Sequence, residues 1–174
     1  MNEPPGLHLR EWDISNQAGL LTGAREILTA YPALDTILIN AGVQCCFSLL
    51  DPPTSTEESI TSKIQVNLIA PVLVLGAFLP HYVVRTKEGQ PGNLLVTSSA
   101  LAFHAVPFYP TYCSTRPGIH AFIVTLREQL VFCSVIVEQN FSVIEVIPPY
   151  TDMEWDVAHR AGEGVHSDAA SAVY

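Results

Sequence analysis

Tyr112 and Arg116, in the stretch YPTYCSTRPGIHAF (109–122), have types and a spacing that could do chemistry. Side chains four residues apart lie on the same face of a helix. A phenol loses its proton near pH 10 in water, and a nearby cation stabilises the phenolate that remains. The pair could therefore donate and accept a proton, provided that the backbone holds both side chains together.

Pro117, directly after Arg116, argues against one regular helix through this stretch. Proline disfavours helical geometry in the preceding residue and would leave the carbonyl of Cys113 without a donor, at a cost of about 3 kcal/mol. We therefore expect a helix to begin at Pro117, with Thr115 near its cap. Tyr112 and Arg116 would then lie in a preceding turn, as a weakened proton-donating pair.

The composition is typical of one globular domain. Of 174 residues, 48% are hydrophobic and 14% are charged, which allows a substantial core and disfavours disorder. We expect residues 1–174 to form a single partial domain, with a poorly patterned tail over 156–174. The formal net charge of −9 argues against a nucleic acid or an anionic membrane as a partner.

Three further features favour a cytoplasmic protein. The first 13 residues contain no basic segment followed by an apolar run, so we expect no secretion signal. The most apolar stretch, 68–80, contains a proline and is shorter than the about 20 residues of a membrane span, which favours a core or interface helix. The four cysteines include no CxxC pair, so we expect reduced thiols and no metal site.

Apolar runs and helical patterns alternate along the chain. Strands are expected over 7–15, 35–42, 92–100 and 141–150, and helices over 16–32, 57–80 and 112–133. This alternation predicts a parallel α/β sheet, whose ligands bind beyond the carboxyl ends of the strands. The residues expected at that edge are Asp13, Asn40 to Gly42, Ser98 and Ser99, and Pro148 to Thr151.

Six short motifs occur in an order that resembles the short-chain dehydrogenase/reductase family. They are Asp13 after a strand, LINAG (38–42), QVNLIAP around Asn67, VTSSALAF (96–103), YCSTR (112–116) and IPPYTD (147–152). The resemblance covers about residues 7 to 155. It implies an α/β, Rossmann-like fold in three layers around a parallel sheet, and an enzyme that uses NADP or NAD.

The resemblance also implies catalytic roles. Tyr112 would be the acid/base, Ser99 would orient a substrate carbonyl, and Arg116 stands where the family has a lysine. Arginine keeps the positive charge but is effectively never deprotonated, so it cannot pass a proton along a relay as lysine can. Asn67 would support the helix and a water relay behind the cation, although it could instead only hydrogen-bond a helix kink before Pro71.

The cofactor-binding residues follow from the same resemblance. Asp13 and Ile14 would contact the adenine, Asn40, Ala41 and Gly42 the adjoining ribose, and Tyr112 with Arg116 the other ribose. Pro148 and Thr151 would lie on the nicotinamide side. The implied partners are a small-molecule carbonyl or alcohol and a second copy of the chain.

The sequence departs from the family at both ends. The glycine-rich phosphate loop TGxxxGxG is absent, since TGARE (22–26) lies inside an expected helix and has no following glycines. The segment that would distinguish NAD from NADP and the last strand are also absent. We therefore expect an incomplete Rossmann-like domain, truncated at both ends and without its first βαβ unit.

Two functions from different classes follow. The first is an NAD(P)-dependent oxidoreductase that interconverts a carbonyl and an alcohol. The alternative is a catalytically inactive remnant that acts as a dimerisation or binding module. A hydrolase built on Ser99, His104 and Asp152 is disfavoured, because no G-x-S-x-G motif surrounds the serine.

Overall fold

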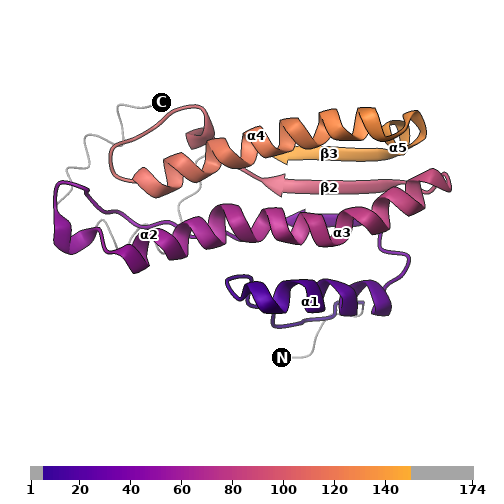
Figure 1. The fold of residues 1–174 in the computed structure, drawn as a ribbon, viewed down its shortest axis with the longest axis horizontal. Helices are drawn as coiled ribbons and strands as arrows, with labels where there is room; N and C mark the ends of the chain where they lie inside the picture. The colour runs from indigo at the N-terminus through magenta and orange to yellow at the C-terminus, as the bar shows by residue number, and fades with distance from the viewer. Residues whose placement is uncertain (1–5, 150–174) are drawn as a thin grey trace.

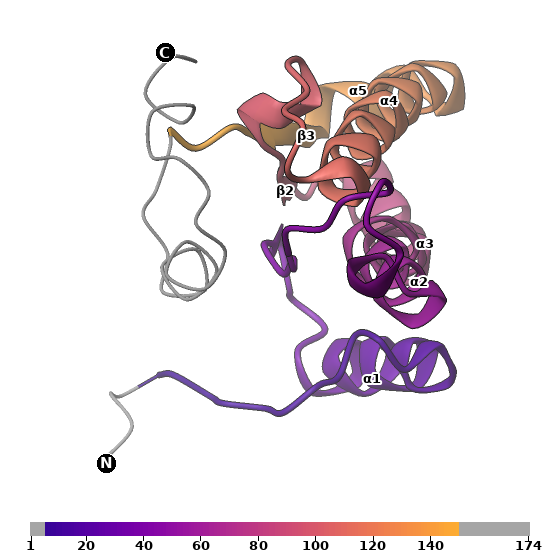
Figure 2. The ribbon, with the colours of Figure 1, turned by 90° about the vertical axis from the view of Figure 1, so that its left-hand side faces the viewer.

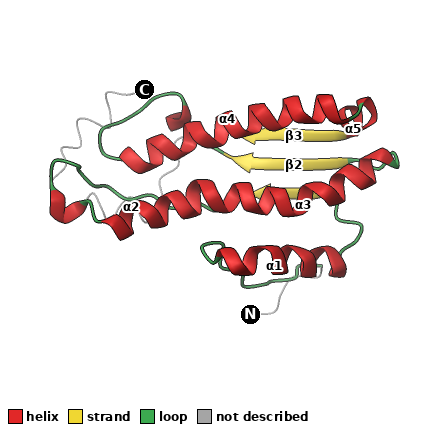
Figure 3. Cartoon of the chain, in the orientation of Figure 1, coloured by secondary structure: helices red, strands yellow, loops and turns green. Residues whose placement is uncertain are grey.

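A three-stranded parallel sheet forms the centre of the protein, in a computed structural model that describes residues 6–149. The strands are β1 (Thr36–Ile39), β2 (Gly92–Thr97) and β3 (Phe141–Val146), in the order β1-β2-β3. Both pairs are parallel, with Ile39 opposite Val96 and Val96 opposite Glu145. The predicted α/β class with a parallel sheet is therefore confirmed (Figure 3).

Helices connect the strands and run beside them (Figure 1). They are α1 (Gln17–Ala30), α2 (Glu57–Ile64), α3 (Ala70–Lys87), α4 (Pro110–Cys133) and α5 (Val135–Asn140). Two short 3-10 segments, η1 (Pro52–Thr54) and η3 (Ala100–Ala102), and a π-helical turn, η2 (Gln65–Ile69), complete the described elements. The brief α5 and the 3-10 segments were not predicted, because six or fewer residues show no periodicity.

The helices of the described residues lie on one face of the sheet (Figure 2). Side chains of a strand alternate between its two faces. Leu94 and Val96 point into the core between sheet and helices, whereas Leu38 is 57% exposed on the other face. Of the three layers predicted for a Rossmann-like fold, the described residues thus supply the sheet and one helical layer.

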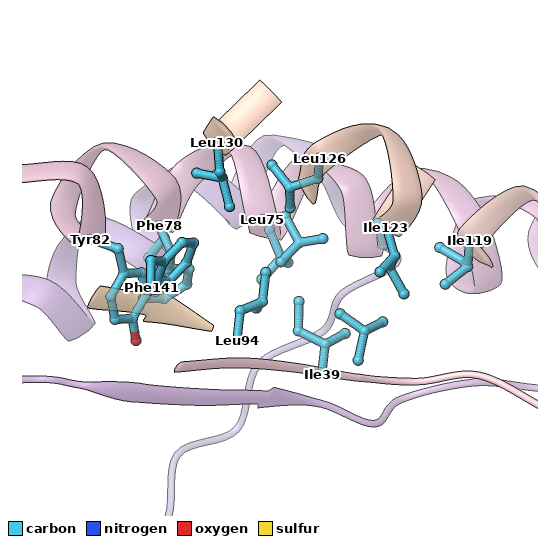
Figure 4. Packing of buried hydrophobic residues seen from close by; sticks show 14 of the residues in the cluster. Ile39, Leu75, Phe78, Tyr82, Leu94, Ile119, Ile123, Leu126, Leu130 and Phe141 are labelled. Carbon is cyan, nitrogen blue, oxygen red and sulfur yellow. The ribbon is translucent and has the colours of Figure 1, made fainter. Parts of the chain in front are cut away.

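The hydrophobic core lies between the sheet and the helices (Figure 4). Its buried members come from every helix but α2 and from all three strands: Leu20, Ala24, Ile39, Ala70, Val74, Leu75, Phe78, Tyr82, Leu94, Val96, Ile119, Ile123, Leu126, Leu130, Val137 and Phe141. This core holds the strand ends and the beginning of α4 in fixed relative positions.

The strand predicted over 7–15 is wrong. Residues 7–13 form no strand, and a turn follows at Ile14 and Ser15. A strand needs a neighbour to satisfy its backbone N–H and C=O groups, and within residues 6–149 no neighbouring strand is available to this segment. Alternating residues alone do not supply that neighbour.

The helix predicted to end before His81 continues to Lys87. Pro80 lies inside α3, and the buried positions Leu75, Phe78, Tyr82 and Thr86 form one stripe across it. The run Glu57–Lys87 is long and apolar enough to cross a membrane by length and composition, a criterion that core helices also meet. Here its inner face packs on α1 and the sheet.

Tyr82 combines tight packing with an unpartnered hydroxyl. The side chain is 1% exposed, and its ring stacks on Phe141 with 5.2 Å between centroids. Within the described part of the chain, no group forms a hydrogen bond with its hydroxyl. Burial raises the pKa of Tyr82 to about 12, because the ionised form would lose its hydration.

Tyr82→Phe is expected to keep or raise stability at neutral pH, by up to about 1 kcal/mol, since it removes a buried polar group without a partner. Above pH 10 the unfolded state of the wild type loses the phenol proton first, so stability falls as the pH rises from 10 towards 12. The variant lacks this part of the loss. Urea denaturation at pH 8 and pH 11 measures both effects, and a less stable variant at pH 8 contradicts the prediction.

Candidate active site

The carboxyl ends of the strands meet at one edge of the sheet, as the parallel order requires. Asn40 follows β1 and Ser98 follows β2, and the two ends are joined because Thr97 Oγ1 donates a hydrogen bond to Asn40 Oδ1 at 2.8 Å. The arrowheads of β2 and β3 point to the end of the molecule where α4 begins (Figure 1). The structure therefore brings Asn40, Ser98 and the start of α4 to the same end of the sheet.

Asn67 is fully buried and holds the segment that follows β1. Its Oδ1 accepts a hydrogen bond from the Val43 N–H at 2.8 Å, and its Nδ2 donates to the Val43 carbonyl at 2.7 Å. It lies in the middle of η2, whose wider π-turn is frequent at functional sites. Pro71 has no N–H to offer the Asn67 carbonyl, which favours this departure from the α-helical ladder.

Asn67→Leu is expected to destabilise the fold by about 1–3 kcal/mol, because both Val43 backbone groups would lose their partly buried hydrogen bonds to the buried amide. Ser62→Ala, on the exposed side of α2, is the control and should change stability by less than about 0.5 kcal/mol. Urea denaturation compares the two. Equal stability of Asn67→Leu and the wild type would show that Asn67 does not hold this segment.

Ser99 is the N-cap of η3, the short 3-10 segment after β2. Its hydroxyl oxygen accepts a hydrogen bond from the Leu101 N–H at 3.1 Å, which leaves its O–H free to donate to a substrate. The neighbouring Ser98 is 2% exposed, and its hydroxyl has no hydrogen-bond partner among residues 6–149. Since η3 packs on α4, Ser99 lies on an element that contacts the helix of Tyr112.

The expectation that a helix would begin at Pro117 is wrong. α4 runs from Pro110 to Cys133 and contains Pro117. Its buried positions form one stripe that starts before this proline: Thr111, Thr115, Arg116, Ile119, Ile123, Leu126 and Leu130. Burial of the stripe offsets the cost of Pro117, and Pro110 is well suited to a first helical turn. Tyr112 and Arg116 are thus held one turn apart on the same helix.

Arg116 packs its guanidinium against the ring of Tyr112. The Arg116 Cζ lies 4.5 Å from the ring centroid, which is a cation–π contact. The side chain is only 5% exposed, and its Nη1 donates to the Thr97 carbonyl at 3.2 Å. Its buried Nε has no hydrogen-bond partner in the described part of the chain. The structure thus holds the positively charged guanidinium against the face of the Tyr112 ring.

Gly42 leaves room for the close approach of this guanidinium. A Cβ at position 42 would collide with Arg116 Nη2 and would come within 3.3 Å of Asn67 Oδ1. Gly42, Asn67 and Arg116, which are far apart in the sequence, therefore converge at one point. Proximity to Tyr112 makes this point the centre of the candidate site.

Of the five residues predicted to bind the adenosine, three line a cleft, whereas Asp13 and Gly42 do not line it. Ile14, Asn40 and Ala41 line a cleft of about 420 Å³, together with apolar residues of α1, β1 and α3. Asp13 is exposed, and its carboxylate accepts hydrogen bonds from Ser15 N at 2.9 Å and Ser15 Oγ at 2.7 Å. These bonds lower the pKa of Asp13, which keeps the carboxylate ionised.

The nicotinamide side is described only in part. Pro148 is half-buried and lies two residues beyond β3, on the same edge as Ser98, whose N–H donates to the Val146 carbonyl at 2.8 Å. Thr151 lies outside the described residues. The roles assigned to all of these side chains stay predictions.

One pair of polar residues was not predicted. His120 Nδ1 and Glu145 Oε2 lie 2.8 Å apart, between α4 and β3. The sequence does indicate that Glu145 has a polar partner, because it interrupts the apolar run FSVIEVI, where an unpaired charge would be costly. Its partner could not be identified without the packing of α4 on β3. Among residues 6–149, no group of three or more His, Cys, Asp or Glu side chains could hold a metal ion.

Comparisons with known proteins agree on one family. The family model described as short chain dehydrogenase matches residues 2–163. An uncharacterized oxidoreductase DltE of Bacillus subtilis (strain 168) is 32% identical over 163 residues, which are 92% of this chain and 60% of that protein. The human 17-beta-hydroxysteroid dehydrogenase type 1 is 29% identical over 150 residues, which cover 85% of this chain and 42% of that protein.

Solved structures show the same fold. A metagenomic short-chain oxidoreductase in complex with NADP is 25% identical, with a TM-score of 0.67 over 86% of this chain and 62% of that one. A gluconate 5-dehydrogenase from Burkholderia cenocepacia J2315 is 18% identical, with a TM-score of 0.73 over 91% and 56%. The chain spans about 60% of the length of DltE and less of the other curated relative. With its family-model match, its parallel sheet and its ordered motifs, the chain belongs to the short-chain dehydrogenase family.

Proposed function

We propose that this protein is an NADP- or NAD-dependent oxidoreductase that interconverts a small-molecule carbonyl and an alcohol. The observation that carries the proposal is the packing of the Arg116 guanidinium on the ring of Tyr112, beside Gly42 and the buried Asn67. The metagenomic short-chain oxidoreductase in complex with NADP, at 25% identity, supports NADP as the first cofactor to test.

Each side chain has a role in this proposal. The Ser99 hydroxyl donates a hydrogen bond to the substrate carbonyl and holds it in place. Tyr112 donates its proton to the oxygen as negative charge develops there, and Arg116 stabilises the phenolate that is left. A bound nicotinamide cofactor supplies or accepts the hydride. Asn67 keeps the segment after β1, and with it Gly42, in position.

The described residues fit parts of a dinucleotide. Ile14, Asn40 and Ala41 line the 420 Å³ cleft, and the ionised Asp13 precedes them in sequence, which suits the adenosine. Tyr112, Arg116 and Pro148 lie on the same side of the sheet and would hold the nicotinamide end.

We propose further that the protein is cytoplasmic and forms a homo-oligomer. Leu73 and Val84 on α3, and Val124 and Val131 on α4, are exposed apolar side chains that a second copy would cover.

A second candidate function, a binding or dimerisation module without catalysis, is favoured by the orientation of Arg116. Its guanidinium is engaged by the Thr97 carbonyl and is nearly excluded from solvent, so less of it is available to a cofactor.

Cofactor titration separates the two functions. Under the first, NADPH or NADH at one hundred times its Kd stabilises the fold by about 2.7 kcal/mol and raises Tm by several degrees. ATP at the same concentration is the control for non-specific nucleotide binding. If neither dinucleotide raises Tm more than ATP does, the oxidoreductase proposal fails and the binding module is favoured.

A further inference from the structure

The half-buried His120 and the buried carboxylate of Glu145 form a polar pair outside the residues that the proposed reaction uses. His120 Nδ1 and Glu145 Oε2 are 2.8 Å apart, and the Glu145 side chain is 7% exposed. The second carboxylate oxygen, Oε1, is buried and has no hydrogen-bond partner among residues 6–149. Glu145 pairs with the buried Val96 in the sheet, so it faces the helices and the core.

Such a pair is a poor way to gain stability. Removing a carboxylate from water costs several kcal/mol, and a buried ion pair is often no more stable than an apolar replacement of similar size. An apolar side chain would fit the run FSVIEVI at this place. The pair instead orients the His120 side chain, because a hydrogen bond from Nδ1–H to a fixed carboxylate sets the orientation of the imidazole ring.

The oriented ring contacts the segment that carries Ser99. The rings of Phe103 and His120 meet edge to face, with 4.8 Å between centroids and an interplanar angle of 70°. Ser99 is the N-cap of the three-residue η3 and Phe103 is its C-cap, so the imidazole contacts the residue after η3, and the substrate-orienting hydroxyl belongs to the residue before it. The same α4 carries Tyr112 two turns before His120.

We propose that His120 and Glu145 are positioning residues that set the place of η3, and so of the Ser99 hydroxyl, relative to Tyr112. The link runs from β3 through Glu145 to His120 on α4, and from there through Phe103 to η3. The expected effect of this link on catalysis rests on the proposed function, whereas its effect on the position of η3 does not. His120 and Glu145 thus support the site but do not contact the substrate.

Two conservative substitutions separate orientation from mere packing. The amide nitrogen of asparagine can replace Nδ1 of histidine as the donor to Glu145, whereas that of glutamine replaces Nε2. His120→Gln should therefore lower kcat for NADPH-dependent reduction of an aromatic aldehyde by about tenfold, since an ångström of misplacement costs up to about 10²-fold. KM for NADPH should stay within about twofold, and His120→Asn should keep most of the rate.

The control is His81→Gln on α3. His81 is also half-buried and its Nε2 lies 3.1 Å from the Leu34 carbonyl, but it belongs to another helix. This variant should leave kcat unchanged. Equal kcat for His120→Gln and the wild type, or equal losses for His120→Gln and His120→Asn, would overturn the proposal.

Amide hydrogen exchange at residues 99–103 provides a readout without turnover. His120→Gln and Glu145→Ala should each speed exchange there, and the double variant should speed it no further, since both remove one link. If the wild type reduces no aldehyde, the proposed function fails, yet this measurement still decides on the pair. Unchanged exchange in both single variants refutes the link to η3.

Discussion

Tyr112→Phe is expected to lower NADPH-dependent carbonyl reduction by about 10²- to 10⁴-fold, the usual contribution of a general acid in its place. The ring would stay against the Arg116 guanidinium, so packing at the start of α4 should be kept. Without the Tyr112 hydroxyl, no proton is donated to the substrate carbonyl oxygen as negative charge develops on it. Initial rates at saturating NADPH, compared with the wild type, measure the effect.

The matched control is Tyr31→Phe at the end of α1. Tyr31 is exposed and lies on another helix, so removal of its hydroxyl should leave the rate unchanged. Both variants should bind NADPH like the wild type. If Tyr112→Phe keeps more than about a tenth of the wild-type rate, then Tyr112 is not the proton donor.

Arg116→Lys combined with Pro117→Ala is expected to raise the reductase rate, by about tenfold. A lysine ammonium can approach the phenol as a point charge and can pass a proton on, which a guanidinium cannot. The substitution would also remove the hydrogen bond that Arg116 Nη1 donates to the Thr97 carbonyl. Because α4 already passes through Pro117, most of the gain should come from Arg116→Lys alone.

Rates of the two single variants and the double variant test this expectation. Arg127→Lys is the control, since Arg127 lies on the same helix and its Nε donates to the Val143 carbonyl at 3.0 Å, away from Tyr112. It should not change the rate. An unchanged rate in the double variant would mean that the arginine does not limit proton transfer.

Periodicity predicted the elements that have long, one-sided patterns. The expected helix 16–32 is α1, and the expected strands 35–42, 92–100 and 141–150 contain β1, β2 and β3. The ends were less well predicted, since the expected helices over 57–80 and 112–133 are longer in the structure. Pro117 was expected to prevent a continuous helix, and the helix over 57–80 was expected to end before His81, but burial of the helix face on both sides of Pro80 and of Pro117 outweighs the local cost of each proline.

The candidate site was predicted as a set of residue types in order, without its contacts. The motifs around Asn40 and Ser99 stand out because they are short polar segments after apolar strands, and those around Asn67 and Tyr112 were identified from the family resemblance. That the Asn67 amide binds Val43 on both sides could not be predicted, since the two lie 24 residues apart.

The amino-acid sequence by itself determined the α/β class, the parallel order and the identity of the family, because alternation of apolar strands with helices and the order of motifs are properties of the chain. Only the tertiary structure decided that the Arg116 guanidinium lies over the Tyr112 ring beside Gly42, and that Glu145 is paired with His120. The contacts of Arg116 with Gly42 and of His120 with Glu145 join α4 to other parts of the chain, and the contact of Arg116 with Tyr112 depends on how α4 continues through Pro117. Their geometry depends on how the core packs, which local propensity does not encode.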